Sequence, residues 1–158
     1  MIPVTSGELA SGLVGEGRMA EPQDIMSFIE NDILSTLPLK GKKVLVTAGP
    51  TYEAIDPVRF IGNHSSGKMG FGIAKAAANL GAEVFLITGP SEEKVNNTLI
   101  QRINVVTAEE MYKACHHYFP EVTIAVLSAA VADYKPKKVA TEKIKKKDTT
   151  LEIELAPT

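Results

Sequence analysis

The residues best suited to chemistry lie between Thr47 and Ala82 of this 158-residue sequence. A glycine-containing turn, TAGPT, follows a hydrophobic run, and a polar insert, EAIDPVRFIGNHSSGKMG, leads into the alanine-rich segment FGIAKAAANLGA. A helix that begins at Ser65, Ser66 and Gly67 would present unpaired backbone N–H groups to an anion. The pattern therefore predicts a nucleotide or phosphate site that includes Ser66 and Gly67.

Neither common nucleotide-binding motif accounts for this segment. The residues GNHSSGKM, from Gly62 to Met69, differ at one position from the P-loop pattern, and Met69 lacks the hydroxyl that would hold Mg²⁺. The dinucleotide-binding pattern also fails, because a long insert stands where a Rossmann crossover turns directly into its helix. Nucleotide binding stays the prediction, but through a different arrangement.

Polar side chains of the insert have both a functional and a structural interpretation. The guanidinium of Arg59 suits a phosphate or a carboxylate, although a salt bridge with Asp56 or Glu53 is the commoner use of such a residue. Asn63 is placed as a capping or turn residue would be. His64 could act as a general base, but the sequence identifies no carboxylate partner for it.

A second candidate region is the strand end SAAVADY. Its small residues would let a ligand approach the backbone of Ser128, Ala129 and Ala130, and open α/β sheets bind ligands at the carboxyl ends of their strands. Asp133 would lie at the opening of this binding site, where it could accept a hydrogen bond from a sugar hydroxyl, an amide or the hydration shell of a metal ion. Alternatively, it would be a turn-forming residue. The lysines of EKIKK, residues 142–146, could reach over a bound triphosphate.

The elements that must position these residues alternate between strands and helices. Such alternation indicates an α/β fold, here a Rossmann-like three-layer sandwich with a mostly parallel sheet. The strands lack strict polar alternation, as expected of strands covered on both faces. Strands are predicted over 43–48, 83–88, 103–106 and 122–130, and helices over 68–80 and 108–118.

The two ends of the chain differ from this pattern. Residues 1–20 are glycine-rich and aperiodic, which predicts a loop, and a helix is predicted from Pro22. Near the other end Leu151, Ile153 and Leu155 would share one face of a strand. Because the chain ends soon after this strand-like run, the sheet is expected to be truncated at its C-terminus.

Composition limits the class of protein. The formal net charge of −2 gives no electrostatic argument for nucleic acid. The longest apolar run, Val122 to Ala132, is too short to cross a bilayer, and the N-terminus does not look like a secretory signal. The single Cys115 cannot form an internal disulfide. We therefore expect a cytoplasmic protein with neither a membrane nor a nucleic acid as partner.

Three separated motifs, TAGPTYEAIDPVRFIGNHSSGKMG, SAAVADY and EKIKK, occur here in an order that resembles the phosphopantothenate–cysteine ligase family. In bacteria this ligase is the C-terminal half of a bifunctional coenzyme A biosynthesis protein. The resemblance assigns residues 40–158 to the N-terminal portion of the ligase domain, and 1–39 to the tail of the decarboxylase domain with a linker helix. The FMN-binding body of the decarboxylase is absent, and Ser11 replaces a proton-donating cysteine, so this chain is not expected to decarboxylate.

The resemblance implies a two-step ligation. CTP activates the carboxylate of 4′-phosphopantothenate as an acyl-cytidylate with loss of pyrophosphate, and the amine of cysteine then displaces CMP. Asn63 would hold the acyl intermediate, and Lys143 would promote its formation by neutralising triphosphate charge. Arg59 would reach the substrate phosphate of a neighbouring subunit, which implies a homodimer. Mg²⁺ would accompany the triphosphate, with protein ligands that the sequence does not assign.

The same resemblance implies contacts along the strand end. Ala129, Ala130 and Asp133 would line the pantothenate and nucleotide pocket, while Leu127 and Ser128 would offer backbone contacts to CTP. Because the family continues beyond the last residue of this chain, we expect weakened CTP binding and little turnover from this polypeptide.

Two other functions stay open at this point. A dinucleotide-binding reductase of Rossmann type would need an acidic residue after the second strand to bind ribose, and LITGP supplies none. In a non-catalytic dimerisation module, the insert and the lysine-rich segment would serve partner contacts alone.

Overall fold

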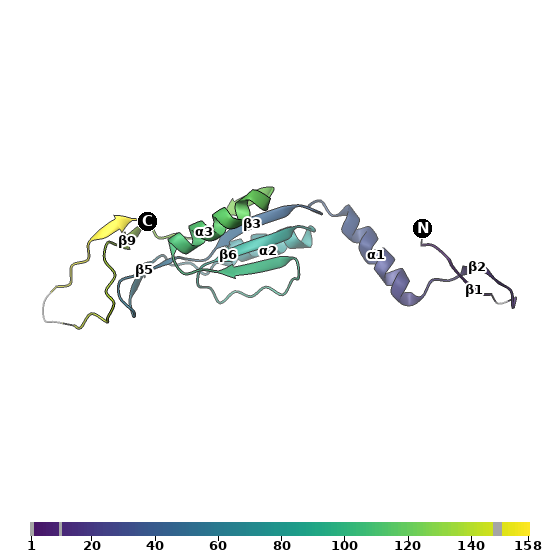
Figure 1. The fold of residues 1–158 in the computed structure, drawn as a ribbon, viewed down its shortest axis with the longest axis horizontal. Coiled ribbons are helices and arrows are strands. Elements are labelled where there is room, and N and C mark those ends of the chain that lie inside the picture. Colours follow the sequence, from purple (N-terminus) through teal and green to yellow (C-terminus); the bar gives the residue numbers. More distant parts are fainter. Residues whose placement is uncertain (1, 10, 147–149) are drawn as a thin grey trace. The chain divides into compact units, whose positions relative to one another are not determined.

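The computed structural model describes residues 2–9, 11–146 and 150–158. The chain divides into two compact units, Met1–Lys40 and Gly41–Thr158. No helix within the described residues is long and apolar enough to cross a membrane. Figure 1 shows the chain as a ribbon coloured along the sequence, with the helices and some of the strands labelled.

The first unit holds a hairpin and one helix. Strands β1 (Thr5–Glu8) and β2 (Val14–Arg18) pair antiparallel. The prediction of a loop over residues 1–20 was therefore wrong in part: glycine-rich strands lack an apolar period, but their backbones still pair, and Gly12 takes the positive φ of 77° that the turn between them needs. The predicted helix is confirmed as α1 (Pro22–Thr36).

The second unit is built on a four-stranded parallel sheet with the strand order β7-β6-β3-β8, which confirms the predicted α/β class. Two predicted strands were confirmed in full. The third begins three residues earlier and ends two residues earlier than predicted. The fourth is two residues shorter at its start and three shorter at its end, where the chain leaves the ladder to form the loop described below. The strands are β3 (Lys43–Ala48), β6 (Glu83–Thr88), β7 (Ile100–Asn104) and β8 (Ile124–Leu127).

Two helices, both as predicted, cover the sheet. Helix α2 (Lys68–Asn79) packs on β3 and β6, and a Cβ added at Gly70 would lie 2.6 Å from Ala48 Cβ, so the helix meets the sheet through a glycine. Helix α3 (Ala108–Tyr118) packs around a core cluster that includes Leu45 and Ile87, and a short 3-10 helix η1 (Phe119–Glu121) follows it. Because Ala48 and Leu45 lie on opposite faces of the same strand, the two helices cover opposite faces of the sheet.

Two small antiparallel pairs lie outside this sheet. The polar insert forms the hairpin β4 (Tyr52–Ala54) and β5 (Phe60–Gly62). Further along, β9 (Tyr134–Pro136) pairs with β10 (Leu155–Pro157). The strand predicted through residues 151–155 was wrong for residues 151–154, which are exposed and outside any strand, since no sheet face in the described structure buries their alternating apolar side chains; Leu155 does lie in β10.

Candidate nucleotide and substrate site

The topology of the sheet marks one edge as a binding position. From β3 the chain proceeds outward on one side to β6 and β7, then crosses to β8 on the other side of β3. Ligands of open α/β sheets bind outside the carboxyl ends of the strands where the order reverses in this way. The carboxyl ends of β3 and β8 are the turn TAGPT and the loop SAAVADY, so the switch point brings together both regions that the sequence singled out.

A pocket of about 340 Å³ opens at this switch point. Ligand pockets commonly begin near this size, at roughly 300 Å³. The predicted nucleotide-binding residues Ser66, Gly67 and Ser128 meet here, although they come from segments more than sixty residues apart. The full lining comprises His64, Ser65, Ser66, Gly67, Lys68, Met69, Gly70 and Ser128.

The anion-binding turn differs in detail from the prediction. Helix α2 begins at Lys68, the start predicted for the segment 68–80, so Ser65 and Ser66 precede the helix instead of forming its first residues. Gly67 is the N-cap, in the left-handed conformation at φ 79°. The hydroxyls of Ser65 and Ser66 accept from the N–H groups of Gly67 and Lys68, at 3.3 and 3.4 Å. Among the described residues, only the N–H groups of Met69 and Gly70 in this first turn have no acceptor, so two donors are left for an anion.

A network of side-chain hydrogen bonds through Ser91 and Arg102 stabilises this turn. The Ser91 hydroxyl donates to the Ser66 carbonyl at 2.7 Å. Arg102 in turn donates to the carbonyls of Ser91 and Glu93, and its guanidinium lies over the ring of Phe71 in α2. The turn is therefore tied to β7 and to the helix that it precedes. Sequence analysis missed Ser91 and Arg102, because nothing local indicates which distant carbonyl they reach.

Two threonines of the TAGPT turn fix the strand-end loop. Thr47 Oγ1 accepts from the N–H groups of Ser128 and Ala129, while Ser128 Oγ donates to the Thr47 carbonyl at 2.7 Å. Thr51 Oγ1 accepts from Ala132 N at 2.9 Å, and Ala130 N donates to the Gly49 carbonyl. The backbone N–H groups of residues 128–130 are thus engaged within the protein. A backbone contact from Ser128 to a ligand would have to use its carbonyl.

The remaining residues predicted on this loop lie apart from that pocket. Leu127 and Ala129 face a second, larger pocket of about 700 Å³ beside α3, lined mainly by apolar side chains. Asp133 is exposed, lines neither of these two pockets, and its carbonyl accepts from Thr158 N. The structure therefore does not bring Asp133 together with Ser66, Gly67 and Ser128.

The insert hairpin carries Asn63 to the strand-end loop. Tyr52 and Phe60 stack across β4 and β5 with ring centroids 3.9 Å apart. Directly after β5, Asn63 Nδ2 donates to the Val131 carbonyl at 2.9 Å. Its side-chain carbonyl oxygen is the group that this bond leaves for a ligand. Glu53, one of the two salt-bridge partners suggested for Arg59, instead accepts from Ala108 N at the start of α3.

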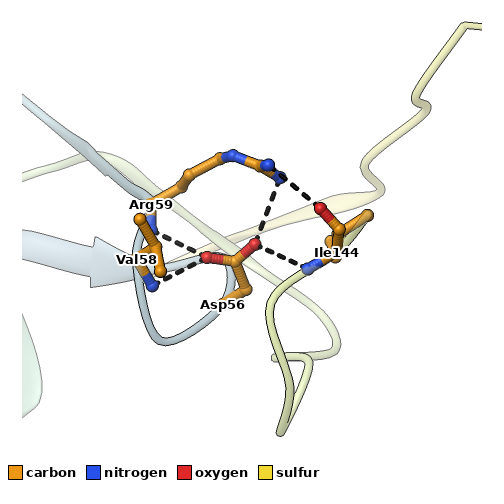
Figure 2. Close-up of polar contacts among 4 residues, drawn as sticks. All are labelled: Asp56, Val58, Arg59 and Ile144. Atoms are coloured by element: carbon orange, nitrogen blue, oxygen red, sulfur yellow. Dashed lines mark hydrogen bonds and ion pairs between the residues drawn. The ribbon is translucent and has the colours of Figure 1, made fainter. Parts of the chain in front are cut away.

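The other suggested partner, Asp56, forms the ion pair with Arg59, at 3.1 Å (Figure 2). The Asp56 carboxylate is fully buried, and it also accepts from the backbone N–H groups of Val58, Arg59 and Ile144. Burial alone would raise the pKa of this carboxyl, but the three N–H donors and the Arg59 guanidinium hold it below its ordinary value. Asp56 is therefore a structural anion of the insert, and sequence analysis considered it only as a partner for Arg59.

Arg59 and Lys143 become neighbours through the same contacts. Arg59 Nη2 donates to the Ile144 carbonyl at 3.0 Å (Figure 2), and Ile144 directly follows the exposed Lys143. Two of the five guanidinium N–H donors are used by Asp56 and Ile144 among the described residues, which leaves others for a ligand phosphate. The insert thus meets the lysine-rich segment 85 residues further along the chain.

The sequence of residues 39–158 matches the family described as "DNA/pantothenate metabolism flavoprotein C-terminal domain". That match covers most of the chain. The chain belongs to this family. The resemblance to phosphopantothenate–cysteine ligases is thereby confirmed, since the relatives of this domain family include coenzyme A biosynthesis bifunctional proteins.

Within the family, three relatives illustrate the similarity. The coenzyme A biosynthesis bifunctional protein CoaBC of Vibrio cholerae is 49% identical over 95% of this chain and 38% of its own length. A protein named cysteine/cysteine sulfinic acid decarboxylase, from an unidentified prokaryote, is 48% identical over 97% of this chain and 44% of that protein. The crystal structure of a CoaBC C-terminal domain is 43% identical, with a TM-score of 0.66 over 78% of this chain and 57% of that domain.

The chain spans less than half the length of these curated relatives.

Proposed function

We propose that this flavoprotein C-terminal domain joins cysteine to 4′-phosphopantothenate at the expense of CTP. In the first half-reaction a carboxylate oxygen of phosphopantothenate attacks the α-phosphorus of CTP, and pyrophosphate leaves. In the second the cysteine amine attacks the acyl carbon, CMP leaves, and the amine gives up a proton as the amide forms. The observation that carries the proposal is the pocket at the switch point, where Ser66 and Gly67 meet Ser128 in a chain of this family.

The geometry supports separate roles for the two ends of the site. The first turn of α2, with its free N–H groups at Met69 and Gly70, favours a phosphate of the nucleotide. Lys143, held close to the insert through Ile144, supplies a mobile positive charge for the triphosphate. Asn63, fixed by Val131, offers its amide oxygen to the acyl intermediate or the attacking amine.

The remaining predicted contacts belong to the same proposal. Arg59 binds the substrate phosphate, and a second copy of the chain completes the site. Mg²⁺ accompanies the triphosphate, held mainly by phosphate oxygens and water, as is usual for this ion. The described residues hold no group of three His, Cys, Asp or Glu side chains placed to bind a metal. Leu127, Ala129, Ala130 and Asp133 contribute surfaces along the strand-end loop.

Titration with CTP and NADP tests the proposal against the alternatives. We expect cytidine-selective binding that Lys143→Ala weakens by about tenfold, as loss of one charge-assisted contact should. Lys75→Ala is the matched control, because Lys75 is an exposed lysine on α2 outside the pocket. Release of pyrophosphate in the presence of CTP and phosphopantothenate then tests the chemistry. Preference for NADP would favour a reductase, and indifference to both nucleotides a dimerisation module.

A further inference from the structure

The insert binds residues 140–146, the lysine-rich segment that contains EKIKK, through three hydrogen bonds. Ala140 N donates to the Ile55 carbonyl at 3.0 Å. Four residues later, Ile144 N donates to Asp56 Oδ2 at 3.1 Å, and the Ile144 carbonyl accepts from Arg59 Nη2 (Figure 2). Both polar groups of one peptide residue are therefore bound by side chains of the insert. A segment with no helix or strand of its own gains a defined backbone direction next to Lys143.

The two oxygens of Asp56 have different tasks. Oδ1 accepts from Val58 N and Arg59 N, both at 2.8 Å, and so closes the turn of the insert on itself. Oδ2 accepts from Arg59 Nη1 and Ile144 N, and so reaches out to the distant segment. The carboxylate is fully buried, and closing the turn alone would need only the first of these oxygens.

We propose that Asp56 is a positioning residue for the ligation, which fixes the approach of Lys143 to the nucleotide by binding Ile144 through Oδ2 while it orients Arg59. The role rests on the proposed function, because Lys143 matters only if it meets the triphosphate. Asp56 itself touches no substrate. It couples the segment that carries the charge to the hairpin that carries Arg59 and Asn63.

Asp56→Asn tests this role with little change in shape. The amide oxygen can still accept from Val58 N and Arg59 N, but the amide nitrogen would face the donors on Arg59 and Ile144. The matched control is Glu53→Gln, which removes the charge of another buried carboxylate of the insert while it keeps an acceptor for Ala108 N. Ile144→Pro is the second variant, since it removes the N–H donor and leaves Asp56 intact.

Amide hydrogen exchange tests the contact between Asp56 and Ile144 independently of enzymatic activity. In Asp56→Asn and Ile144→Pro, exchange over residues 138–146 should rise by about tenfold while β3 and β6 stay protected. Glu53→Gln should leave this segment unchanged. Unchanged exchange over residues 138–146 in Asp56→Asn would mean that Asp56 does not hold this segment through Ile144.

Pyrophosphate release reads the consequence for chemistry. Asp56→Asn should lower kcat by about 10- to 100-fold, as expected for a misplaced catalytic group, and in a Lys143→Ala background it should lower kcat no further. Equal losses in the two backgrounds, or faster exchange without any loss of kcat, would refute the positioning role. Because little turnover is expected of this polypeptide, the absence of both cytidine-selective binding and CTP-dependent pyrophosphate release from the unmodified protein would instead refute the proposed function. Amide exchange would still decide whether Asp56 holds the segment through Ile144.

Discussion

Gly70 is the point at which α2 meets the sheet, and replacing it with alanine gives a sharp test of the fold around the site. The added Cβ would lie 2.6 Å from Ala48 Cβ, 2.7 Å from Ser128 Oγ and 2.9 Å from the Thr47 carbonyl oxygen. Carbon atoms in contact normally stay about 3.5–4.0 Å apart. The start of α2 would therefore have to move outward by about 1 Å.

The size of the effect follows from two opposing contributions. Overpacking of a tight contact costs about 1–3 kcal/mol. Alanine in place of glycine within a helix restores up to about 1 kcal/mol. Because three atoms lie within 3 Å of the new Cβ and one of them belongs to the backbone, the overpacking cost should fall in the upper part of its range. We expect Gly70→Ala to be less stable than the unmodified chain by about 1–2 kcal/mol.

Gly72 provides the matched control. It lies in the same helix, is exposed, and a Cβ there would meet nothing within 4 Å. Gly72→Ala should therefore stabilise the chain by about 0.5–1 kcal/mol. Urea unfolding followed by circular dichroism should separate the two variants by about 1 M in midpoint. Midpoints that coincide would mean that α2 does not pack on Ala48 as described. Gly70→Ala should also weaken CTP binding, which Gly72→Ala should leave unchanged.

Three further predictions concern the turn, the buried acid and the thiol. Gly67→Ala should lower the free energy of unfolding, measured in urea, by more than the about 1–2 kcal/mol that a left-handed alanine costs, because Gly49 N and Ser91 Oγ lie 3.2 Å from the new Cβ. Gly41→Ala is the control: its φ is 73° but nothing lies within 4 Å of the new Cβ, so only the conformational cost should apply. The lowered pKa of Asp56 means that the unfolded chain binds the proton first, so this residue stabilises the fold above its ordinary value of 3.8 and ceases to do so as the pH falls through the lower native pKa. Asp56→Asn should therefore flatten the fall of the urea midpoint below pH 4, and an unchanged slope would contradict the assignment. Burial raises the pKa of the Cys115 thiol, so iodoacetamide at pH 7.5 should alkylate the native chain about tenfold more slowly than the urea-unfolded chain, by mass spectrometry; equal rates would place the thiol in solvent.

The sequence predicted those parts of the fold whose signals are local. Apolar runs, a proline at a helix start and glycine-containing turns located α1, α2, α3, β3 and β6 to within a residue or two. The end of β8 was misplaced because its apolar run continues into SAAVADY, where bonds to Thr47 and Thr51 replace the ladder. The hairpin of the first unit was missed because glycine carries no apolar period. These errors arise where pairing depends on a distant partner.

The site shows the same division. Composition and motif order were enough to select Ser66, Gly67 and Ser128, and the strand order then explains why they meet. Nothing in the sequence around Asp56 indicates that its second oxygen is used 88 residues away at Ile144. A side chain's long-range partner is fixed by topology, and a single sequence contains no direct record of it. The predicted roles of Asn63 and Lys143 stay predictions.

The departure from the P-loop pattern explains why the lysine-rich segment should matter. In a P-loop many backbone donors and an invariant lysine surround the phosphates. Here the hydroxyls of Ser65 and Ser66 occupy two of the N–H groups at the start of α2, and Met69 replaces the metal-binding hydroxyl. A turn with two remaining donors cannot by itself balance the charge of a triphosphate. Lys68, at the position of the P-loop lysine, lines the pocket and can supply one positive charge. We expect Lys143 to supply a further one, because it is next to Ile144, which side chains of the insert bind at both its N–H and its carbonyl. Because this turn has fewer free N–H donors than a P-loop, contacts that orient a distant lysine toward the triphosphate should contribute more to nucleotide binding here.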